Sequence, residues 1–223
     1  MQFDQFANQY EGILDRSVAI SGEDSGYFAE YKARYLSRLL GPSFSGNALE
    51  FGCGVGRLSR FIKQLLPAIK LDGFDVSGES IRRIDPSLSS QGVFTSDLTK
   101  LKRDYQLIVI ANVMHHIPIE QRQSVIQTLA DRMASEGMLV IFEHNPANPI
   151  TRWVVERCPF DADAALLSPK ETRAYLTETN LEVVRHDFIV FMPRFLAWLR
   201  PVEPWLANLP LGAQYAMVAR NYA

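Results

Sequence analysis

The sequence predicts an α/β fold built on a mostly parallel β-sheet with helices on both faces. Short apolar strands alternate with amphipathic helices over residues 47–143, an alternation typical of a parallel sheet covered on both sides. A glycine-rich loop joins the first of these strands to a helix, and the strand at 105–111 is apolar throughout, as in a strand buried on both faces. The length of 223 residues suits one domain with a sizeable core.

The elements follow one another in a regular order. Two helices come first, at 2–16 and 27–40, with a loop between them and Gly41-Pro42 after the second, where a helix normally ends. The alternating elements are then expected as strand 47–51, helix 57–66, strand 70–75, helix 78–84, strands 92–95 and 105–111, helix 119–134 and strand 137–143. Ser168 and Pro169 begin a further helix at 168–179, because serine suits the N-cap and proline the first turn.

Composition limits the class of protein. The net charge of -2, from 23 basic and 25 acidic residues, gives no broad electrostatic attraction to nucleic acid, although it leaves a local basic patch open. The two cysteines, Cys53 and Cys158, are far apart and do not suggest a disulfide framework. The first residues have neither a basic start nor an apolar run, so they do not read as a signal peptide. These features predict a cytoplasmic protein.

A glycine-rich loop after the first strand is the most informative motif. Gly52, Gly54 and Gly56 allow a tight turn that a ligand can approach closely, and the amides at the next helix start favour anionic or carbonyl groups. The spacing G-x-G-x-G differs from the G-x-G-x-x-G of dinucleotide enzymes, and an acid, Glu50, precedes it. Asp75 ends the next strand about 20 residues on, where an acid can accept hydrogen bonds from both ribose hydroxyls. A plain tight turn is the alternative interpretation.

Ordered motifs continue from this loop. They read E-F-G-C-G-V-G, G-F-D-V-S, T-S-D-L, L-I-V-I-A-N-V-M-H-H-I-P and G-M-L-V-I-F-E-H, in that order over residues 46–145. With these motifs the chain resembles the class I S-adenosylmethionine-dependent methyltransferases. The resemblance implies a Rossmann-like three-layer sandwich, with a mostly parallel seven-stranded sheet, an antiparallel last strand and helices on both faces. Residues 181–190 and 213–220 fit the last two strands.

The resemblance also implies S-adenosylmethionine as cofactor and S-adenosylhomocysteine as product. By the same resemblance, Glu50 contacts the methionine amino group, Asp75 holds the ribose, and Asp97 with Leu98 flanks the adenine. The other residues assigned to the cofactor are Gly52, Cys53, Gly54, Gly56, Val76 and Asn112.

Histidines follow the fourth and fifth strands, at the edge of the sheet where ligands bind in such folds. His115 and His116 come after the fourth strand, and His144 comes at the end of the fifth. A hydroxyl or acidic-carbon acceptor must lose a proton, which a histidine can accept. We expect His144 to be the general base. His115 and His116 are adjacent and should point in different directions, so that one faces the site while the other packs or caps.

The segment after the fifth strand is expected to form a wall of the acceptor pocket. Its two Asn-Pro pairs favour an extended loop, because proline disfavours helix at the preceding residue. Asn145, Arg152 and Trp153 are the expected acceptor contacts, and a rigid connector is the alternative. Tyr10, in an N-terminal helical segment at 1–41, either closes the pocket as a lid, as such segments often do in the family, or merely packs.

An aromatic insertion at about 188–211 lengthens the connection between the last two strands. Prolines break it, so it is no membrane span. Its aromatic side chains beside arginines leave three roles open: packing as a lid, a homodimer contact, or contact with a lipid surface.

No metal is predicted, since the chain lacks the H-x-x-x-H and C-x-x-C spacings. Asn112 stands where metal-dependent catechol-type methyltransferases carry an aspartate. Asn112-Val113-Met114-His115 replaces the N-P-P-Y of enzymes that methylate nucleic-acid amines. The sequence therefore predicts a single-domain methyltransferase over 1–223 that acts on a small-molecule or sugar- or lipid-linked acceptor, with no nucleic-acid partner.

Two other functions stay open at this point. A nicotinamide-dependent oxidoreductase is disfavoured by the glycine spacing and by Glu50. A noncatalytic protein that binds S-adenosylmethionine to sense or scaffold is not excluded by any residue.

Overall fold

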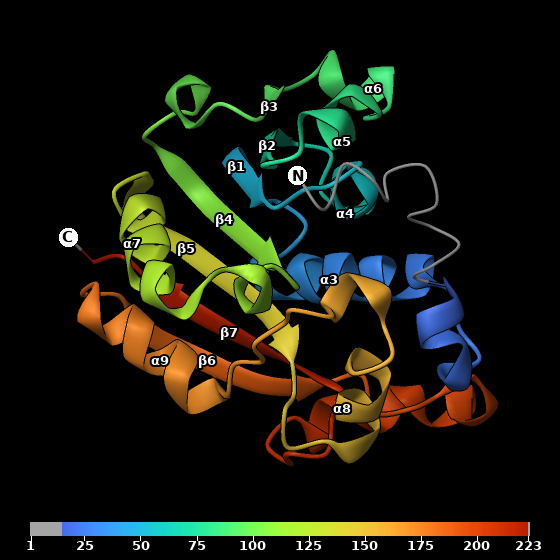
Figure 1. Ribbon diagram of the computed structural model, residues 1–223. Coiled ribbons are helices and arrows are strands. Elements are labelled where there is room, and N and C mark those ends of the chain that lie inside the picture. The colour runs from blue at the N-terminus through green and yellow to red at the C-terminus, as the bar shows by residue number, and fades with distance from the viewer. Residues whose placement is uncertain (1–14, 223) are drawn as a thin grey trace.

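The computed structural model describes residues 15–222, apart from the side chain of Phe160, and arranges them as a seven-stranded sheet between layers of helices (Figure 1). The strands are β1 (Gly46–Phe51), β2 (Ile69–Phe74), β3 (Phe94–Thr95), β4 (Tyr105–Ala111), β5 (Met133–His144), β6 (Glu182–Ile189) and β7 (Gln214–Arg220). Their order across the sheet is β3-β2-β1-β4-β5-β7-β6. The first five strands are parallel, and β7 runs antiparallel between β5 and β6. The predicted fold class is confirmed.

Helices connect the strands and cover both faces of the sheet. The α-helices are α3 (Ser25–Leu40), α4 (Arg57–Leu65), α5 (Gly78–Arg82), α6 (Pro86–Ser89), α7 (Ile119–Ala130), α8 (Pro149–Val155) and α9 (Pro169–Glu178). The 3₁₀ segments are η1 (Ala19–Ser21), η2 (Leu98–Lys100), η3 (Met114–His116), η4 (Pro159–Asp161) and η5 (Arg194–Leu206).

Two apolar cores form because neighbouring residues of a strand point to opposite faces of the sheet. On one face, Leu36 of α3 and Ile62 of α4 pack with Val109 and other buried strand residues. On the other face, Ile126 of α7 and Leu176 of α9 pack with the alternate strand residues. The central strands are therefore buried on both sides, which explains their continuous apolar sequences.

The C-terminal part of α7 and the start of β5 differ from prediction. The helix ends at Ala130 and not at 134, and β5 begins at Met133 and not at 137. Met133 pairs with Tyr105 at the start of β4, so tertiary pairing draws these residues into the sheet. Gly137 consequently lies within the strand and does not mark its start.

The Asn-Pro segment after β5 also differs from prediction, because it turns into a helix. Asn148 is the N-cap of α8, and its side chain accepts hydrogen bonds from the amides of Ile150 (2.9 Å) and Thr151 (3.0 Å). Pro149 takes the first helical position, where its missing N–H costs nothing. Proline disfavours helix at the residue before it, but it allows a helix to begin at the proline itself. An asparagine directly before it then serves as the N-cap.

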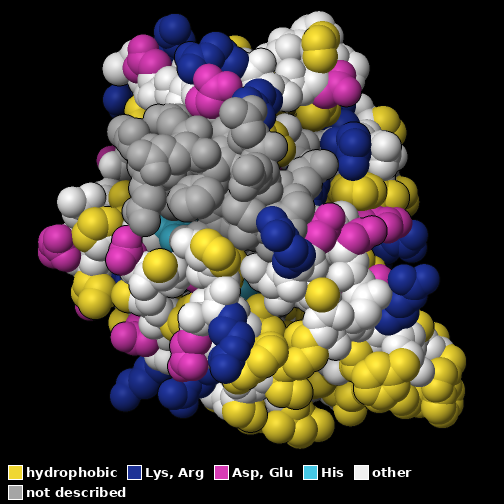
Figure 2. Space-filling model, turned by 45° about the vertical axis from the view of Figure 1, so that its right-hand side comes forward, with side chains coloured by type: hydrophobic (Ala, Val, Ile, Leu, Met, Phe, Trp, Pro, Cys, Tyr) yellow, Lys and Arg dark blue, Asp and Glu magenta, His cyan; other side chains and the backbone are white. Residues whose placement is uncertain are grey.

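The connection before β7 carries large exposed apolar side chains. In and after η5 these are Phe195 (76% exposed), Trp198 (74%), Trp205 (83%) and Leu211 (67%). Figure 2 shows hydrophobic side chains gathered along the lower part of one face of the molecule. Among the described residues, no helix combines the length and apolarity needed to cross a membrane.

The structure describes only part of the N-terminal helical segment. Tyr10 and most of the predicted first helix lie outside the described residues. The helix predicted at 27–40 is α3, which packs against α4 and the sheet. The lid function of this segment stays a prediction.

Candidate functional site

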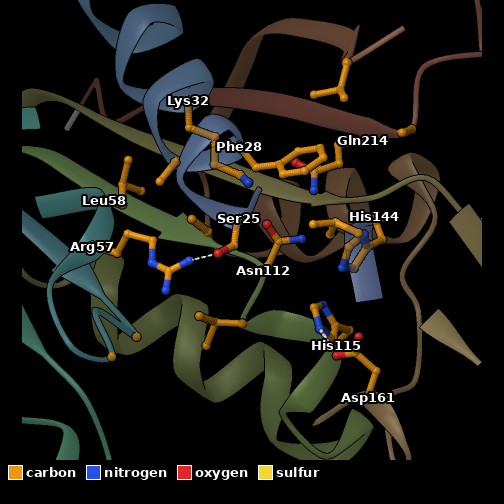
Figure 3. Close-up of a pocket in the computed structure, with 18 of the residues that line it drawn as sticks. Ser25, Phe28, Lys32, Arg57, Leu58, Asn112, His115, His144, Asp161 and Gln214 are labelled. Carbon is orange, nitrogen blue, oxygen red and sulfur yellow. Dashed lines mark hydrogen bonds and ion pairs between the residues drawn. The ribbon is translucent and has the colours of Figure 1, made fainter. Parts of the chain in front are cut away.

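A cavity of about 790 Å³ opens at the carboxyl ends of the parallel strands. Its walls come from the loops after β1, β2, β4 and β5, from α3 and from the segment that leads into η5. This volume lies within the range of about 300–1,000 Å³ that is common for ligand pockets. Figure 3 shows Arg57 and Leu58 on one side of the pocket and His144, His115 and Asp161 on the other.

The glycine loop forms one side of this pocket. Its backbone is held to the next strand, since the amides of Gly52 and Cys53 both donate to the carbonyl oxygen of Phe74, at 2.7 and 2.9 Å. Gly52 has φ +79°, and a Cβ there would lie 2.2 Å from a methyl carbon of Val113. The position therefore requires glycine, because Val113 fills the place of a side chain, and the backbone of Gly52 lines the pocket. Gly54 also lines the pocket, whereas Gly56 lies behind it as the N-cap of α4.

Asp75 is fixed at the end of β2 by backbone donors. One carboxylate oxygen accepts from the amide of Gly54 and the other from that of Ser77, both at 2.8 Å. Asp75 and Val76 line the pocket beside the glycine loop, where the sequence placed them. The ribose contact of Asp75 stays a prediction.

A buried acid and a buried amine lie together on the same side. Burial raises the pKa of Glu50 to about 8, although a hydrogen bond of 2.5 Å from Ser59 opposes this shift. Burial lowers the pKa of Lys32 to about 8, although the negative charges of Glu143 and Glu50 act to raise it. Sequence reasoning missed Lys32, yet it stands on the buried face of α3 with Ala29, Ala33 and Leu36. A lysine at such a position is a signal that can be found in a sequence.

Three polar atoms in the pocket wall lack a hydrogen-bond partner among the described residues. They are Asn112 Nδ2, Gln214 Oε1 and the Tyr27 hydroxyl, and all three are buried. Unpaired buried polar groups are costly, so such atoms indicate a polar ligand. Asn112 was assigned to the cofactor from the sequence, whereas Gln214 and Tyr27 were not identified.

His115 is clamped between two acids. Its Nδ1 lies 2.6 Å from Glu143 Oε2, and its Nε2 lies 3.4 Å from Asp161 Oδ1. Burial disfavours charge on this ring, but the two carboxylates outweigh it and raise its pKa to about 9. Glu143 also accepts from the amides of Val113 (3.1 Å) and Met114 (2.8 Å), which fixes it behind the ring. Both ring nitrogens of His115 therefore face carboxylates, and a role of His115 as a base stays a prediction.

His116 turns to the same acid, which corrects the expectation that the adjacent histidines point in different directions. Its Nε2 lies 3.4 Å from Asp161 Oδ1, and the rings of His115 and His116 have centroids 4.1 Å apart. The short 3₁₀ turn of η3 places both rings on one side. His144 joins this group, with its ring centroid 5.1 Å from that of His115. Burial, together with the charge of His115, lowers the pKa of both His116 and His144 to about 4.

The three residues expected to contact the acceptor do not line the cavity. Asn145 is buried, and its side chain donates to the carbonyls of Pro210 (3.1 Å) and Gly212 (2.8 Å). Arg152 and Trp153 lie on the outer side of α8, with the Trp153 ring 4.3 Å from the guanidinium of Arg157. The pocket is lined here by His144 at the end of β5, by Asn148 before α8, and by Ile150, Thr151 and Val154 of α8. The side chains that line the cavity here therefore differ from those expected of an extended loop, and an acceptor contact of Asn145, Arg152 or Trp153 stays a prediction.

Two further cofactor assignments lie away from the cavity lining. Asp97 is exposed and caps η2, accepting from the amide (2.9 Å) and hydroxyl (2.7 Å) of Thr99. Leu98 packs against the apolar core.

Cys53 does line the cavity, and burial raises its pKa well above the usual value, so it is a thiol and not a nucleophile.

Comparison with known proteins identifies the family. A family model described as a methyltransferase domain matches residues 25–186. The chain is 29% identical over 151 residues to ribosomal RNA small subunit methyltransferase C of Vibrio vulnificus, a match that covers 60% of this chain and 44% of that protein. The chain thus spans less than half the length of this relative.

Solved structures agree with the fold. A methyltransferase from Archaeoglobus fulgidus described as SAM-dependent superposes with a TM-score of 0.69 at 17% identity, covering 89% of this chain and 95% of that one. The N-methyltransferase NodS from Bradyrhizobium japonicum, solved with S-adenosylhomocysteine, has a TM-score of 0.60 at 20% identity and covers 86% of each chain.

The ribosomal RNA methyltransferases among the relatives contradict the predicted acceptor class. Several curated relatives carry this name, which contradicts the prediction of a small-molecule acceptor and no nucleic-acid partner. That prediction relied on the net charge of the whole chain and on one missing motif, and neither feature measures what a single pocket accepts. The chain therefore belongs to the family described as a methyltransferase domain, and it has the fold of S-adenosylmethionine-dependent methyltransferases.

Proposed function

We propose that this chain transfers the methyl group of S-adenosylmethionine to a protic acceptor atom held beside His144. The observation that carries the proposal is that one cavity joins the glycine loop and Asp75 to His144. A cofactor seated on the glycine loop then faces an acceptor on the histidine side. The sulfonium methyl is already activated, so the chain needs mainly to align the acceptor with it.

The residues present fit the cofactor. The glycine-loop backbone and the carboxylate of Asp75, which line the cavity, suit the methionine and ribose parts, and Asn112 Nδ2 supplies a donor that has no partner among the described residues. Glu50 would accept a hydrogen bond from the methionine ammonium, and Lys32 would be the cation for the methionine carboxylate. Both are buried, which strengthens such interactions.

His144 accepts the acceptor's proton as the methyl group is transferred. It lies at the end of β5 and lines the cavity, whereas the ring nitrogens of His115 face Glu143 and Asp161. His115 is instead a positioning residue that holds the wall of the pocket.

We further propose that the acceptor is an RNA nucleotide. The ribosomal RNA methyltransferases among the relatives favour this acceptor class. The cavity lies at the strand ends behind α3 and α8, so a nucleotide reaches it by turning out of its stack, as bases do in other enzymes that modify them.

Two assays test the cofactor and acceptor in turn. Titration calorimetry with S-adenosylmethionine and S-adenosylhomocysteine should show binding that Asp75→Ala weakens, and failure to bind either compound would contradict the whole proposal. Transfer of a labelled methyl group should then be measured with small-subunit ribosomal RNA, with assembled small subunits and with a protein-free extract of small metabolites. Label in RNA supports the acceptor proposal, and label in the extract alone contradicts it.

The base is tested with matched variants. His144→Ala should lower kcat by about 10²- to 10⁴-fold while leaving the affinity for S-adenosylhomocysteine unchanged. His186→Ala, in β6 and outside the cavity lining, should keep full turnover. Equal turnover of His144→Ala and the unaltered chain would show that positioning alone suffices.

A further inference from the structure

Three metal-ligating side chains converge on the histidine side of the pocket. One ring nitrogen each from His115 and His116 and one carboxylate oxygen of Asp161 lie within 4.8 Å of one another. We propose that these three residues bind a divalent transition-metal ion such as Zn²⁺. The site is additional to the proposed methyl transfer and is tested separately from it.

The distances fit ligands of one ion better than direct hydrogen bonds. His115 Nε2 and His116 Nε2 each lie 3.4 Å from Asp161 Oδ1. Charge-assisted hydrogen bonds between such groups are about 2.7–2.9 Å long. Two ligand atoms that each lie about 2.1 Å from a tetrahedral ion are separated by about 3.4 Å. Both nitrogen–oxygen distances therefore match the spacing around a bound ion.

Glu143 provides the outer support that metal-binding histidines usually have. It holds His115 Nδ1 at 2.6 Å, which directs the other nitrogen of the ring toward Asp161. The amides of Val113 and Met114 hold Glu143 in turn. A carboxylate behind a ligating histidine fixes the tautomer and orientation of its ring. This arrangement does not depend on the methyl-transfer proposal.

The location leaves room for a fourth ligand. His115, His116 and Asp161 all line the main cavity, and His144 lies beside them (Figure 3). Two imidazoles and one carboxylate make a three-ligand set like those of metal sites that keep a position for water or substrate. Nitrogen ligands favour Zn²⁺ or Co²⁺ over Mg²⁺, which prefers oxygen.

This proposal differs from the sequence prediction of no metal, which rested on local spacing. Motifs such as H-x-x-x-H find ligands that share one helix. Here the third ligand comes from η4, far along the chain from η3, and only the fold joins them.

The test uses the full chain without a histidine tag, after removal of metal with EDTA. Calorimetry with Zn²⁺ should give one site of micromolar affinity or tighter, and Co²⁺ should give the intense visible spectrum of a four-coordinate ion. Asp161→Asn and His116→Gln should each weaken Zn²⁺ binding more than 100-fold, and Glu143→Gln should weaken it about 10- to 100-fold. His186→Gln, a histidine outside the cluster, should bind Zn²⁺ as the unaltered chain does.

The outcomes separate this site from the methyl-transfer site. Each variant is also titrated with S-adenosylhomocysteine, so that unchanged cofactor binding shows that the variant folds. Absence of Zn²⁺ and Co²⁺ binding by the unaltered chain would overturn the metal site without touching the proposed function. Equal Zn²⁺ affinity in His116→Gln or Asp161→Asn would also overturn it. The Co²⁺ spectrum of the unaltered chain keeps the test decisive even where a variant does not fold.

Discussion

Single residues in the pocket carry charge states that folding has shifted. Glu50 and Lys32 are both buried, and both have pKa values near 8, one raised and one lowered. A group whose pKa differs between folded and unfolded chains makes stability depend on pH. The two residues act in different ranges, since the pKa of Glu50 moves up from 4.5 and that of Lys32 down from 10.5.

Glu50→Gln should flatten the pH dependence of stability between pH 5 and 8. The folded chain keeps the Glu50 proton in this range while the unfolded chain has lost it. The stabilisation is therefore complete below about pH 4.5 and is lost as the pH rises through about 8. The slope for one proton is at most about 1.4 kcal/mol per pH unit. Urea unfolding at several pH values measures the pH dependence of the unfolding free energy, and the exposed substitution Glu178→Gln is the control. If the free energies of Glu50→Gln and of the unaltered chain change with pH in parallel, the expectation is wrong.

Among the elements, η5 shows how one buried acid holds an otherwise exposed segment. Glu203 is buried and accepts hydrogen bonds from the Tyr31 hydroxyl (2.7 Å) and from the amides of Phe191 (3.2 Å) and Met192 (2.9 Å). It thereby ties η5 to α3 and to the chain after β6. In the sequence it reads as an interruption among aromatic residues, because its partners lie on other elements.

Glu203→Ala should destabilise the chain by about 1–3 kcal/mol, since three donors lose their acceptor. Trp198→Ala is the matched control in the same segment. Trp198 is 74% exposed, and a surface substitution of this kind changes stability by no more than about 0.5 kcal/mol. Chemical denaturation of both variants decides the matter, and equal losses would mean that packing of the aromatic side chains holds η5.

For the whole molecule, the pocket joins distant parts of the chain. Its lining residues extend along the chain from Val18 to Gln214. They include residues of α3 and the residues that lead from η5 into β7. A ligand bound there contacts segments from both ends of the described chain, so binding should stabilise the fold as one unit.

S-Adenosylhomocysteine at 100 times its Kd should therefore raise the Tm. Mass action adds about 2.7 kcal/mol, which corresponds to roughly 5–10 °C for a chain of this size. Differential scanning fluorimetry measures the shift, and Asp75→Ala at the same ligand concentration should show a smaller one. An unchanged Tm for the unaltered chain would argue against cofactor binding at this pocket.

Local patterns were sufficient for much of the fold and for several of the residues that line the pocket after β1, β2 and β4. Alternating strands and helices, the glycine loop and the ordered motifs predicted the parallel sheet, and the structure confirms it. The side chains that follow β1, β2 and β4 reach the pocket because parallel strands end at a common edge. The sequence by itself therefore determined the fold class and where the pocket would lie.

The acceptor side was decided by tertiary structure. Lys32, Asp161 and Gln214 reach the pocket from α3, η4 and β7, and no local spacing connects them. Asn145 does not line the cavity, because its side chain donates to the carbonyls of Pro210 and Gly212. The periodicity of apolar residues in the sequence determines which face of a helix or strand is buried. Long-range packing determines which of these faces lie against one another. The histidine cluster exists only where those faces meet.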